Sequence, residues 1–217
     1  MCGRFNLTAN SAQVCEAFGL ERVSDYKPSF NIAPSQTILN ITQLPGENLQ
    51  ASYSHWGLIP SWAKDTKMSS HLINARAETI TEKPSFRTAF KKRRCLIPAT
   101  GFYEWAKTEH GKQAYHIYRE DSQLFAFAGL WEYWEHNADI VYSCTIITTA
   151  ANALMQPIHE RMPIIISREN YAYWLDSDQS QTNLQQLLAI DAYEAMMLKP
   201  ISNRVNSPFH DDAECLV

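Results

Sequence analysis

The sequence predicts an α+β fold: a single domain with a mostly antiparallel, barrel-like sheet as its core and helices at its flanks. About eight short apolar or alternating stretches are typical of strands, and three or four stretches have the apolar spacing of helices. Many gaps in the chain have the length of a hairpin, which favours antiparallel pairing. Neither an internal repeat nor a linker rich in glycine or serine divides the 217 residues. We therefore expect one domain over residues 1–217.

The strands are predicted from short apolar runs that end at turn-forming residues. Residues 30–34 are expected to be a loop that leads into the first strand, and residues 45–48, Pro-Gly-Glu-Asn, are expected to be a turn. The expected strands cover residues 37–42, 49–56, 95–99, 114–118, 124–130, 141–148, 164–166 and 195–201.

The helices are predicted from capping residues and apolar spacing. Asn10 or Ser11 can cap a helix in which Val14 and Phe18 form one apolar stripe and Gly19 ends the helix. Three more helices are expected: one capped by Thr81 with Pro84 in its first turn and Phe86 and Phe90 on its buried side, one over residues 167–175 and one over residues 183–188.

Composition excludes several classes of protein. Hydrophobic residues make up 45% of the chain and aromatic residues 12%, which excludes a disordered or fibrous protein. No apolar run reaches the ~18–20 residues of a membrane-spanning helix, and the N-terminus has no signal-peptide pattern, so we expect a cytoplasmic protein without a membrane partner. The five cysteines are odd in number and contain no C-x-x-C pair, so neither a disulfide framework nor a metal site or other cofactor is expected.

Charge is distributed unevenly along the chain. The net charge is −4, which argues against bulk binding of nucleic acid. Residues 1–105 nevertheless hold 12 Lys and Arg against 8 Asp and Glu, whereas residues 106–217 hold 7 against 15. This asymmetry is typical of a basic face on an otherwise acidic protein.

The start of the chain carries the most distinctive chemistry. Aminopeptidases remove Met1 when the next residue is small, as Cys2 is, and Cys2 then carries an α-amine with a reference pKa near ~7.7–8.0 and a thiol with one near ~8.5. Such a 1,2-aminothiol attacks an aldehyde through its amine and closes a thiazolidine with its thiol. It can instead act as a thiol nucleophile with its own amine as the base. Cys2 can equally be a tolerated small residue without a chemical role.

Two further side chains suit acid–base chemistry. Glu104 stands between Tyr103 and Trp105, where partial desolvation would raise the pKa of its carboxyl group. A hydrogen-bonded structural glutamate is the alternative. His159 lies in a polar stretch just before the apolar run 164–166, where active-site side chains tend to sit. A packed or surface histidine is the alternative there.

Two other stretches have both a structural and a functional interpretation. Residues 91–94, Lys-Lys-Arg-Arg, form either the solvated C-terminal end of the predicted helix or a phosphate-contacting patch. Residues 56–62 hold two tryptophans and a proline around a glycine, which makes a stiff aromatic loop. Its tryptophans are either core residues or exposed stacking surfaces.

The motifs taken together resemble the SRAP family (SOS-response-associated peptidase), whose members crosslink to abasic sites in single-stranded DNA. Each motif is modest alone, but their order and spacing cover essentially the whole chain and are highly specific. The motifs are Met1-Cys2-Gly3-Arg4, Asn31-x-Ala33-Pro34, the loop from Trp56-Gly57 to Trp62, Asn74-x-Arg76, Gly101-Phe102-Tyr103-Glu104-Trp105 and His159-x-Arg161-Met162-Pro163.

The resemblance implies a catalytic role for four residues. Cys2 would become N-terminal and form a thiazolidine with the aldehyde of the ring-opened sugar. Asn74 would hold the sugar, and Glu104 would assist proton transfers during ring opening and imine formation. His159 would be a second acid–base residue, also involved in reversing the link.

The resemblance also implies a DNA-binding face on a monomer that needs no cofactor and no metal. Arg4, Arg76 and Arg161 would hold phosphates, Trp62 would wedge against bases at the lesion, and Thr148 would line the site. Planar guanidinium groups bond two phosphate oxygens at once, and aromatic rings stack on any base. The chain departs from relatives that carry a basic residue just before Ser85-Phe86, because Pro84 stands there. The resemblance further implies a cytoplasmic protein that joins the nucleoid when bound to damaged DNA.

Other classes remain as alternatives. Class II glutamine amidotransferases also begin Met-Cys-Gly and use Cys2 as an N-terminal nucleophile, but those chains usually carry a large synthase domain. Autoproteolysis reduces here to the loss of Met1 and is compatible with crosslinking. A pure binding module would leave Glu104 and His159 without a role.

Overall fold

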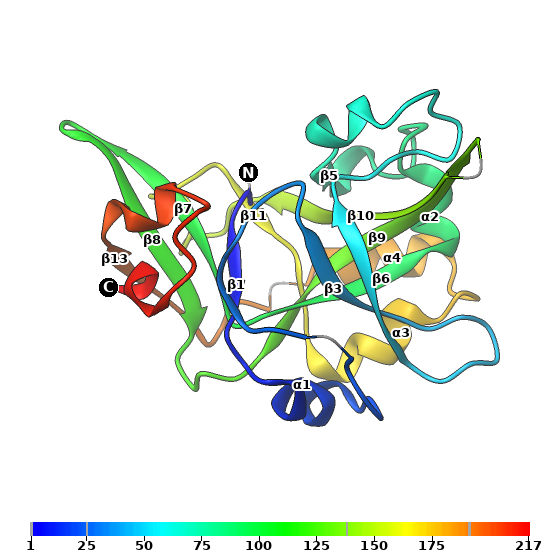
Figure 1. Cartoon of the computed structure of the whole chain (residues 1–217), viewed down its shortest axis with the longest axis horizontal. Coiled ribbons are helices and arrows are strands. Elements are labelled where there is room, and N and C mark those ends of the chain that lie inside the picture. Colours follow the sequence, from blue (N-terminus) through cyan, green and yellow to red (C-terminus); the bar gives the residue numbers. More distant parts are fainter. Residues whose placement is uncertain (1, 25, 138, 191) are drawn as a thin grey trace.

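A computed structural model describes residues 2–24, 26–137, 139–190 and 192–217. Its centre is a small barrel in which five strands close into a ring (Figure 1). The ring runs through β10 (Asp139–Ala150), β4 (Gln50–Trp56), β3 (Thr37–Thr42), β6 (Arg94–Ala99) and β9 (Phe125–His136), and β9 pairs again with β10. The β10–β4 pairing is parallel and the other four pairings are antiparallel.

Three short strands extend this sheet. β5 (Asn74–Arg76) pairs parallel with the C-terminal half of β10, and β11 (Arg161–Pro163) pairs antiparallel with the same half. β12 (Ile165–Ile166) pairs with β9. β10 is therefore the strand on which residues from three distant parts of the sequence meet.

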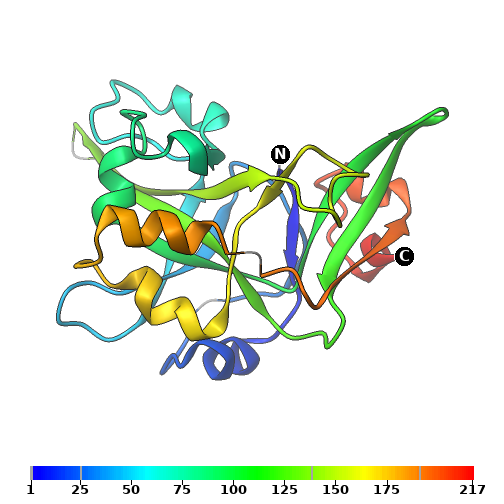
Figure 2. The same ribbon diagram turned by 180° about the vertical axis from the view of Figure 1, so that it is seen from behind.

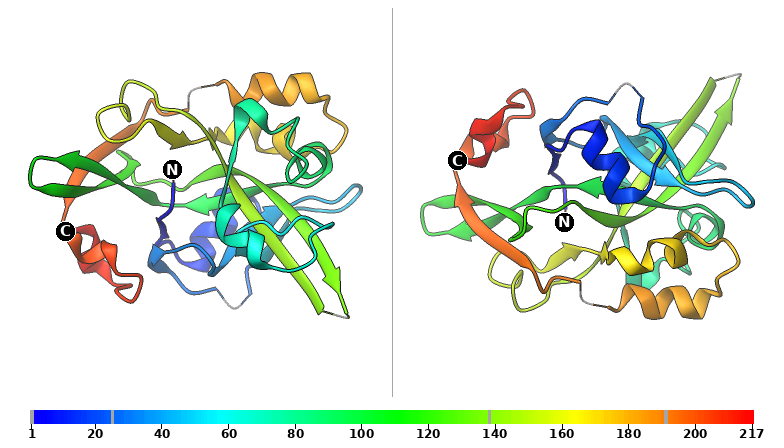
Figure 3. Two further views of the ribbon diagram at one scale, coloured as in Figure 1. Left: turned by 90° about the horizontal axis from the view of Figure 1, so that it is seen from above. Right: turned by 90° about the horizontal axis from the view of Figure 1, so that it is seen from below.

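A second sheet stands against the barrel, and its pairings are antiparallel (Figure 1). Its strands lie in the order β13 (Met196–Ile201), β8 (Gly111–Arg119), β7 (Gly101–Thr108), β1 (Phe5–Leu7) and β2 (Ser29–Ile32). Seen from above, the segment leading into β1 lies between the β7–β8 hairpin and the helical turns after β4 (Figure 3). The start of the chain is thus placed where the two sheets meet.

The helices are short and lie outside the sheets. From behind, α3 (Tyr171–Leu175) and α4 (Gln181–Leu188) lie side by side near α2 (Arg87–Lys92), and α1 (Ser11–Phe18) lies below them (Figure 2). In the described part of the chain, 3-10 helices cover Lys67–His71, Ala77–Thr79, Arg168–Asn170, Asn203–Asn206 and Ala213–Leu216. Among the described residues, none of the helices has the length and apolar character required to cross a membrane.

The core joins the two sheets through aromatic side chains. Phe5 of β1 contacts Trp56 and Phe127 of the barrel edge-on, with ring centroids 5.2 and 5.7 Å apart. Phe102 of β7 meets the same Phe127 at 5.9 Å. Edge-to-face packing of buried rings adds to the free energy gained by removing their surface from water. This packing fixes β1 and β7 against the barrel.

The predicted fold class is confirmed: the protein is an α+β domain with mostly antiparallel sheets that form a small barrel. The helix capped by Asn10 and ended by Gly19, which has a φ of 66°, is confirmed, and so are the strands over 37–42 and 141–148 within their observed bounds. The expected loop at residues 30–34 is partly wrong, because β2 occupies Ser29–Ile32.

The predicted start of the second helix is wrong. α2 begins at Arg87, not near Thr81. Proline disfavours helical geometry at the preceding residue and lacks a backbone N–H. Pro84 therefore follows a turn, in which Lys83 donates its N–H to Thr79, and the helix forms only beyond Phe86.

The basic run 91–94 is divided between solvent and core. Lys91 and Lys92 are exposed, as expected for a helix end. Arg93 pairs with Glu132 at 2.7 Å. Arg94 is buried in β6 and donates to backbone carbonyls of Phe90, Lys91, Trp174 and Asp176, so the prediction of a solvated end is wrong for Arg94.

Candidate active site

Cys2 is buried where the N-terminal segment enters β1. The side chain of Asn74 donates a hydrogen bond from Nδ2 to the backbone carbonyl of Cys2 at 2.9 Å. Asn74 is held in turn by β5, which pairs Asn74 with Ile146 of β10. The two predicted catalytic residues, 72 positions apart in sequence, therefore meet through a hydrogen bond.

Glu104 belongs to the same site. β1 pairs with β7, and the N–H of Tyr103 bonds the carbonyl of Arg4 at 2.9 Å, which places Glu104 beside the start of the chain. Burial raises the pKa of the Glu104 carboxyl to about 7. Burial also raises the pKa of the Cys2 thiol, and the negative charge of Glu104 adds to that shift. A buried carboxyl group that titrates near neutrality can both give and take a proton.

The amide oxygen of Asn74 is an unused acceptor. Oδ1 is buried and has no hydrogen-bond partner among the described residues. Leaving a buried acceptor unpaired costs about 1–3 kcal/mol. An O–H or N–H group of a bound molecule would satisfy it.

His159 lies in the loop before β11, and its Nδ1 contacts the backbone of Arg161. The backbone N–H of Arg161 donates to Nδ1 at 2.9 Å. The Arg161 carbonyl lies 3.2 Å from the same Nδ1, so the neutral ring can carry its proton on either nitrogen. Burial lowers the pKa of His159, so the neutral form prevails at pH 7. The neutral imidazole has one donor and one acceptor nitrogen.

The predicted phosphate ligands differ in their surroundings. Arg76 is exposed at the end of β5 and stands opposite Thr148 of β10 in register. Arg161 donates from Nη2 to the carbonyl of Thr148 at 2.8 Å and forms an ion pair with Glu78. Thr148 itself is buried. These residues gather around one end of β10.

Arg4 is engaged inside the protein. Its Nη1 donates to Asn31 Oδ1 at 2.8 Å and to the carbonyl of Val205 at 2.7 Å. Asn31 Nδ2 in turn donates to the carbonyls of Ser207 and His210. Arg4 and Asn31 thus tie the C-terminal segment to β1 and β2, and a contact of Arg4 with phosphate stays a prediction.

Trp62 is an exposed tryptophan, with 56% of its surface accessible. Its Nε1 points to the carbonyl of Pro84 at 3.4 Å. Trp56, at the other end of the loop, is fully buried and donates to the carbonyl of Ile73 at 2.9 Å. The two tryptophans of the loop therefore take one role each, Trp56 in the core and Trp62 at the surface. Pro84 lies against Trp62.

Two sets of residues near the site were missed by the sequence interpretation. Glu78 pairs with Arg161, and its place in Asn74-x-Arg76-x-Glu78 was the available signal. Asn6 donates to Tyr103 Oη at 2.8 Å and contacts His116 Nε2 at 3.0 Å. Burial lowers the pKa of His116 to about 3, so this ring is neutral and serves to hold β1 against β7 and β8.

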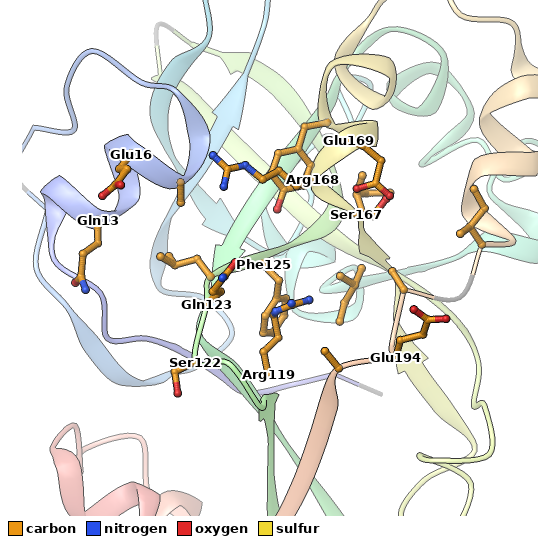
Figure 4. A pocket seen from close by; sticks show the side chains of 18 residues that line it. Gln13, Glu16, Arg119, Ser122, Gln123, Phe125, Ser167, Arg168, Glu169 and Glu194 are labelled. Atoms are coloured by element: carbon orange, nitrogen blue, oxygen red, sulfur yellow. The ribbon is translucent and has the colours of Figure 1, made fainter.

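A cleft of about 680 Å³ lies elsewhere, between α1, the β8–β9 turn and α3 (Figure 4). None of the predicted site residues lines it. Arg119 and Arg168 share it with three glutamates, Glu16, Glu169 and Glu194, so its charges largely cancel (Figure 4).

Metal ligation has no evident place in the described residues. No group of three or more His, Cys, Asp or Glu side chains there could hold a metal ion. The five cysteines are free thiols.

The barrel with its adjoining antiparallel sheet is a fold that a solved structure shares. A protein from Bacteroides thetaiotaomicron has the same fold, with a TM-score of 0.89, 29% identity, and coverage of 99% of this chain and 98% of that one.

The chain belongs to the SRAP (SOS response associated peptidase) family, whose model matches residues 1–208. It is 43% identical over 222 residues to the Bacillus subtilis protein named abasic site processing protein YoqW, covering 100% of this chain and 99% of that protein. It is 32% identical over 222 residues to abasic site processing protein HMCES of Xenopus tropicalis, covering 88% of this chain and 66% of that protein.

Proposed function

We propose that this protein processes abasic sites in single-stranded DNA by forming a covalent thiazolidine bond through Cys2 after Met1 has been removed. The observation that carries the proposal is the meeting of buried Cys2 with Asn74 and with Glu104, whose pKa is about 7. The names of the relatives give the substrate class. Met1 lies outside the described residues, and its removal, by the site itself or by a host aminopeptidase, is part of the proposal.

The first step is the opening of the sugar ring. An abasic sugar exists mostly as a closed hemiacetal, which must open to expose its aldehyde. Glu104 takes the proton of the anomeric hydroxyl and returns it to the ring oxygen as the bond between the anomeric carbon and the ring oxygen breaks, so no net charge is created. Asn74 Oδ1 accepts a hydrogen bond from a sugar hydroxyl, which satisfies its unused acceptor. A group with a pKa near 7 is suited to both directions of proton transfer.

The second step joins the protein to DNA. The α-amine of Cys2 attacks the aldehyde carbon to give a carbinolamine, and Glu104 donates the proton with which its hydroxyl leaves as water. The thiol then adds to the carbon of the resulting iminium ion, and its proton returns to the Glu104 carboxylate. Burial keeps the Cys2 thiol protonated, which favours the amine as the first nucleophile and disfavours thiolate attack on an amide.

Contacts outside this centre would hold the strand. Arg4, Arg76 and Arg161 bind phosphates, and Trp62 stacks on a base at the lesion. Thr148 holds the guanidinium of Arg161. His159 acts as a second acid–base residue and assists the reverse reaction. The protein acts as a monomer in the cytoplasm and joins the nucleoid at damaged DNA.

Intact-mass measurement tests the proposal directly. Protein expressed from its own start codon should lack Met1. Incubation with an oligonucleotide that contains one abasic site should increase the protein mass by that of the oligonucleotide, less one water. The same oligonucleotide with an unmodified base is the matched control and should add nothing. A processed N-terminus without any adduct would contradict the proposal.

A further inference from the structure

Arg161 and Glu78 form a bidentate ion pair at the edge of the candidate site. Arg161 Nη1 lies 2.6 Å from Glu78 Oε1, and Nη2 lies 3.0 Å from Glu78 Oε2. Nη2 also donates to the carbonyl of Thr148 at 2.8 Å. Both protons of Nη2 and one of Nη1 are therefore taken in the free protein.

The carboxylate lies on the solvent side of the pair. The Arg161 side chain is 11% exposed and that of Glu78 is 47% exposed. A ligand that approaches the guanidinium from solvent therefore meets Glu78 first. The buried Nε of Arg161 has no hydrogen-bond partner among the described residues, so this guanidinium is not saturated by the protein.

The charge of a second arginine, Arg76, also acts on the Glu78 carboxylate. The hydrogen bond from Arg161 lowers the pKa of Glu78 most, and the charges of Arg161 and Arg76 lower it further. Glu78 therefore remains ionised at neutral pH, near both arginines. It lies in the 3-10 helix Ala77–Thr79, which directly follows Arg76 on the chain. Glu78 thus places one negative charge on the Arg161 guanidinium and close to the charge of Arg76, as a DNA phosphate bound there would.

We propose that Glu78 occupies the phosphate position of this site in the free protein and is displaced by the DNA backbone. The inference rests on the proposed function, because it takes Arg161 and Arg76 as phosphate ligands. Carboxylate and phosphate present the same pair of oxygens to a guanidinium fork, so they compete for it. The competition lowers affinity for intact strands, and stable attachment then depends on the covalent step at an abasic sugar. Glu78 is thus a specificity-determining residue.

Glu78→Gln is the test, with Glu82→Gln as the matched control. Glu82 is an exposed glutamate four residues further on, so its replacement removes the same charge without touching Arg161. Binding of an intact single-stranded oligonucleotide is measured by fluorescence anisotropy between 50 and 300 mM salt. We expect Glu78→Gln to bind about 3–10-fold tighter at low salt. Its log–log salt slope should steepen by about 0.7, the value for one more phosphate neutralised. Glu82→Gln should leave the slope unchanged.

A double-mutant comparison assigns the effect to the ion pair. In an Arg161→Ala background, Glu78→Gln should change affinity much less than in the wild type, because the competitor and its arginine act as one unit. Glu78→Asp keeps the charge and should retain the wild-type slope, which provides a second variant if Glu78→Gln folds poorly. Unchanged or weaker binding by a folded Glu78→Gln protein would overturn the inference and leave Glu78 as a support for Arg161.

Adduct formation with an abasic oligonucleotide is measured on the same samples. A wild type that crosslinks while Glu78→Gln binds intact DNA no more tightly would overturn the competition alone. A wild type that forms no adduct would overturn the proposed function, whatever the behaviour of Glu78.

Discussion

The candidate site has a buried interior, formed by Cys2 and Glu104, and a more exposed rim, formed by Arg76, Arg161 and Trp62. The two regions differ in the charge state that their surroundings favour. In the interior, Cys2 and Glu104 are buried, and burial raises the pKa of both groups so that each favours its neutral form. At the rim, Arg76 is exposed, and the Arg161 guanidinium is paired with a half-exposed carboxylate. Trp62 presents its ring to solvent.

The difference separates chemistry from binding. Desolvation costs the charged form of an acid several kcal/mol when the group is fully buried, which raises its pKa. Exposed cations keep their charge and attract phosphates over a distance that salt shortens. Substitutions in the interior should therefore change the crosslinking rate and leave the affinity for DNA unchanged. Substitutions at the rim should change the affinity for DNA and its salt dependence.

Cys2→Ala should have the largest effect. The α-amine survives after removal of Met1 and still forms an imine, but without the thiol no thiazolidine closes. Stable adduct should fall to background in the absence of reductant, borohydride should trap the imine, and nicked DNA should accumulate because amines promote β-elimination at abasic sites. Denaturing gels with and without borohydride measure all three. A wild-type yield of stable adduct from Cys2→Ala would mean that another residue is the nucleophile.

Glu104→Gln should slow crosslinking by about 10²–10⁴ and leave the affinity for DNA nearly unchanged. The wild-type rate should show an inflection near pH 7, where the pKa of Glu104 lies, and the variant should lack it. An unchanged rate in Glu104→Gln would make the glutamate structural.

The free energy of unfolding of Glu104→Gln should depend on pH differently from that of the wild type. The pKa of Glu104 is higher in the folded protein than its ordinary value of 4.5. Its protonated form therefore stabilises the wild type below about pH 4.5, and this contribution is lost as pH rises towards 7. The free energy of unfolding of Glu104→Gln relative to wild type should increase by about 2–3 kcal/mol over that range. Urea unfolding at pH 4.5 and 7.5 measures the difference.

Arg76→Ala should have the smallest effect, a several-fold loss of affinity for single strands with a log–log salt slope flatter by about 0.7. Trp62→Ala is its counterpart at the rim and should lower affinity with the slope intact, because stacking releases no counterions. Neither change should alter the crosslinking rate at saturating DNA. Anisotropy titrations at four salt concentrations give both quantities, and an unchanged slope for Arg76→Ala would place that arginine away from the backbone.

The sequence by itself determined the fold class, most of the strands and the candidate residues. Alternating apolar runs and caps such as Asn10 act locally, so they can be read from neighbouring residues. The motifs around Cys2, Asn74, Glu104 and His159 had enough order and spacing to indicate the family. The start of α2 was misjudged because Pro84 outweighed the possible cap at Thr81.

Only the tertiary structure decided what each charge does. Arg94 and Arg76 look alike in sequence, yet one is buried among backbone carbonyls and the other is exposed. The bond from Asn74 to Cys2, the pairing of Arg161 with Glu78 and the binding of Arg4 by Asn31 and Val205 each join residues at least 27 positions apart. Burial and partners of a charged group depend on such long-range packing, and they set its pKa and its availability to a ligand.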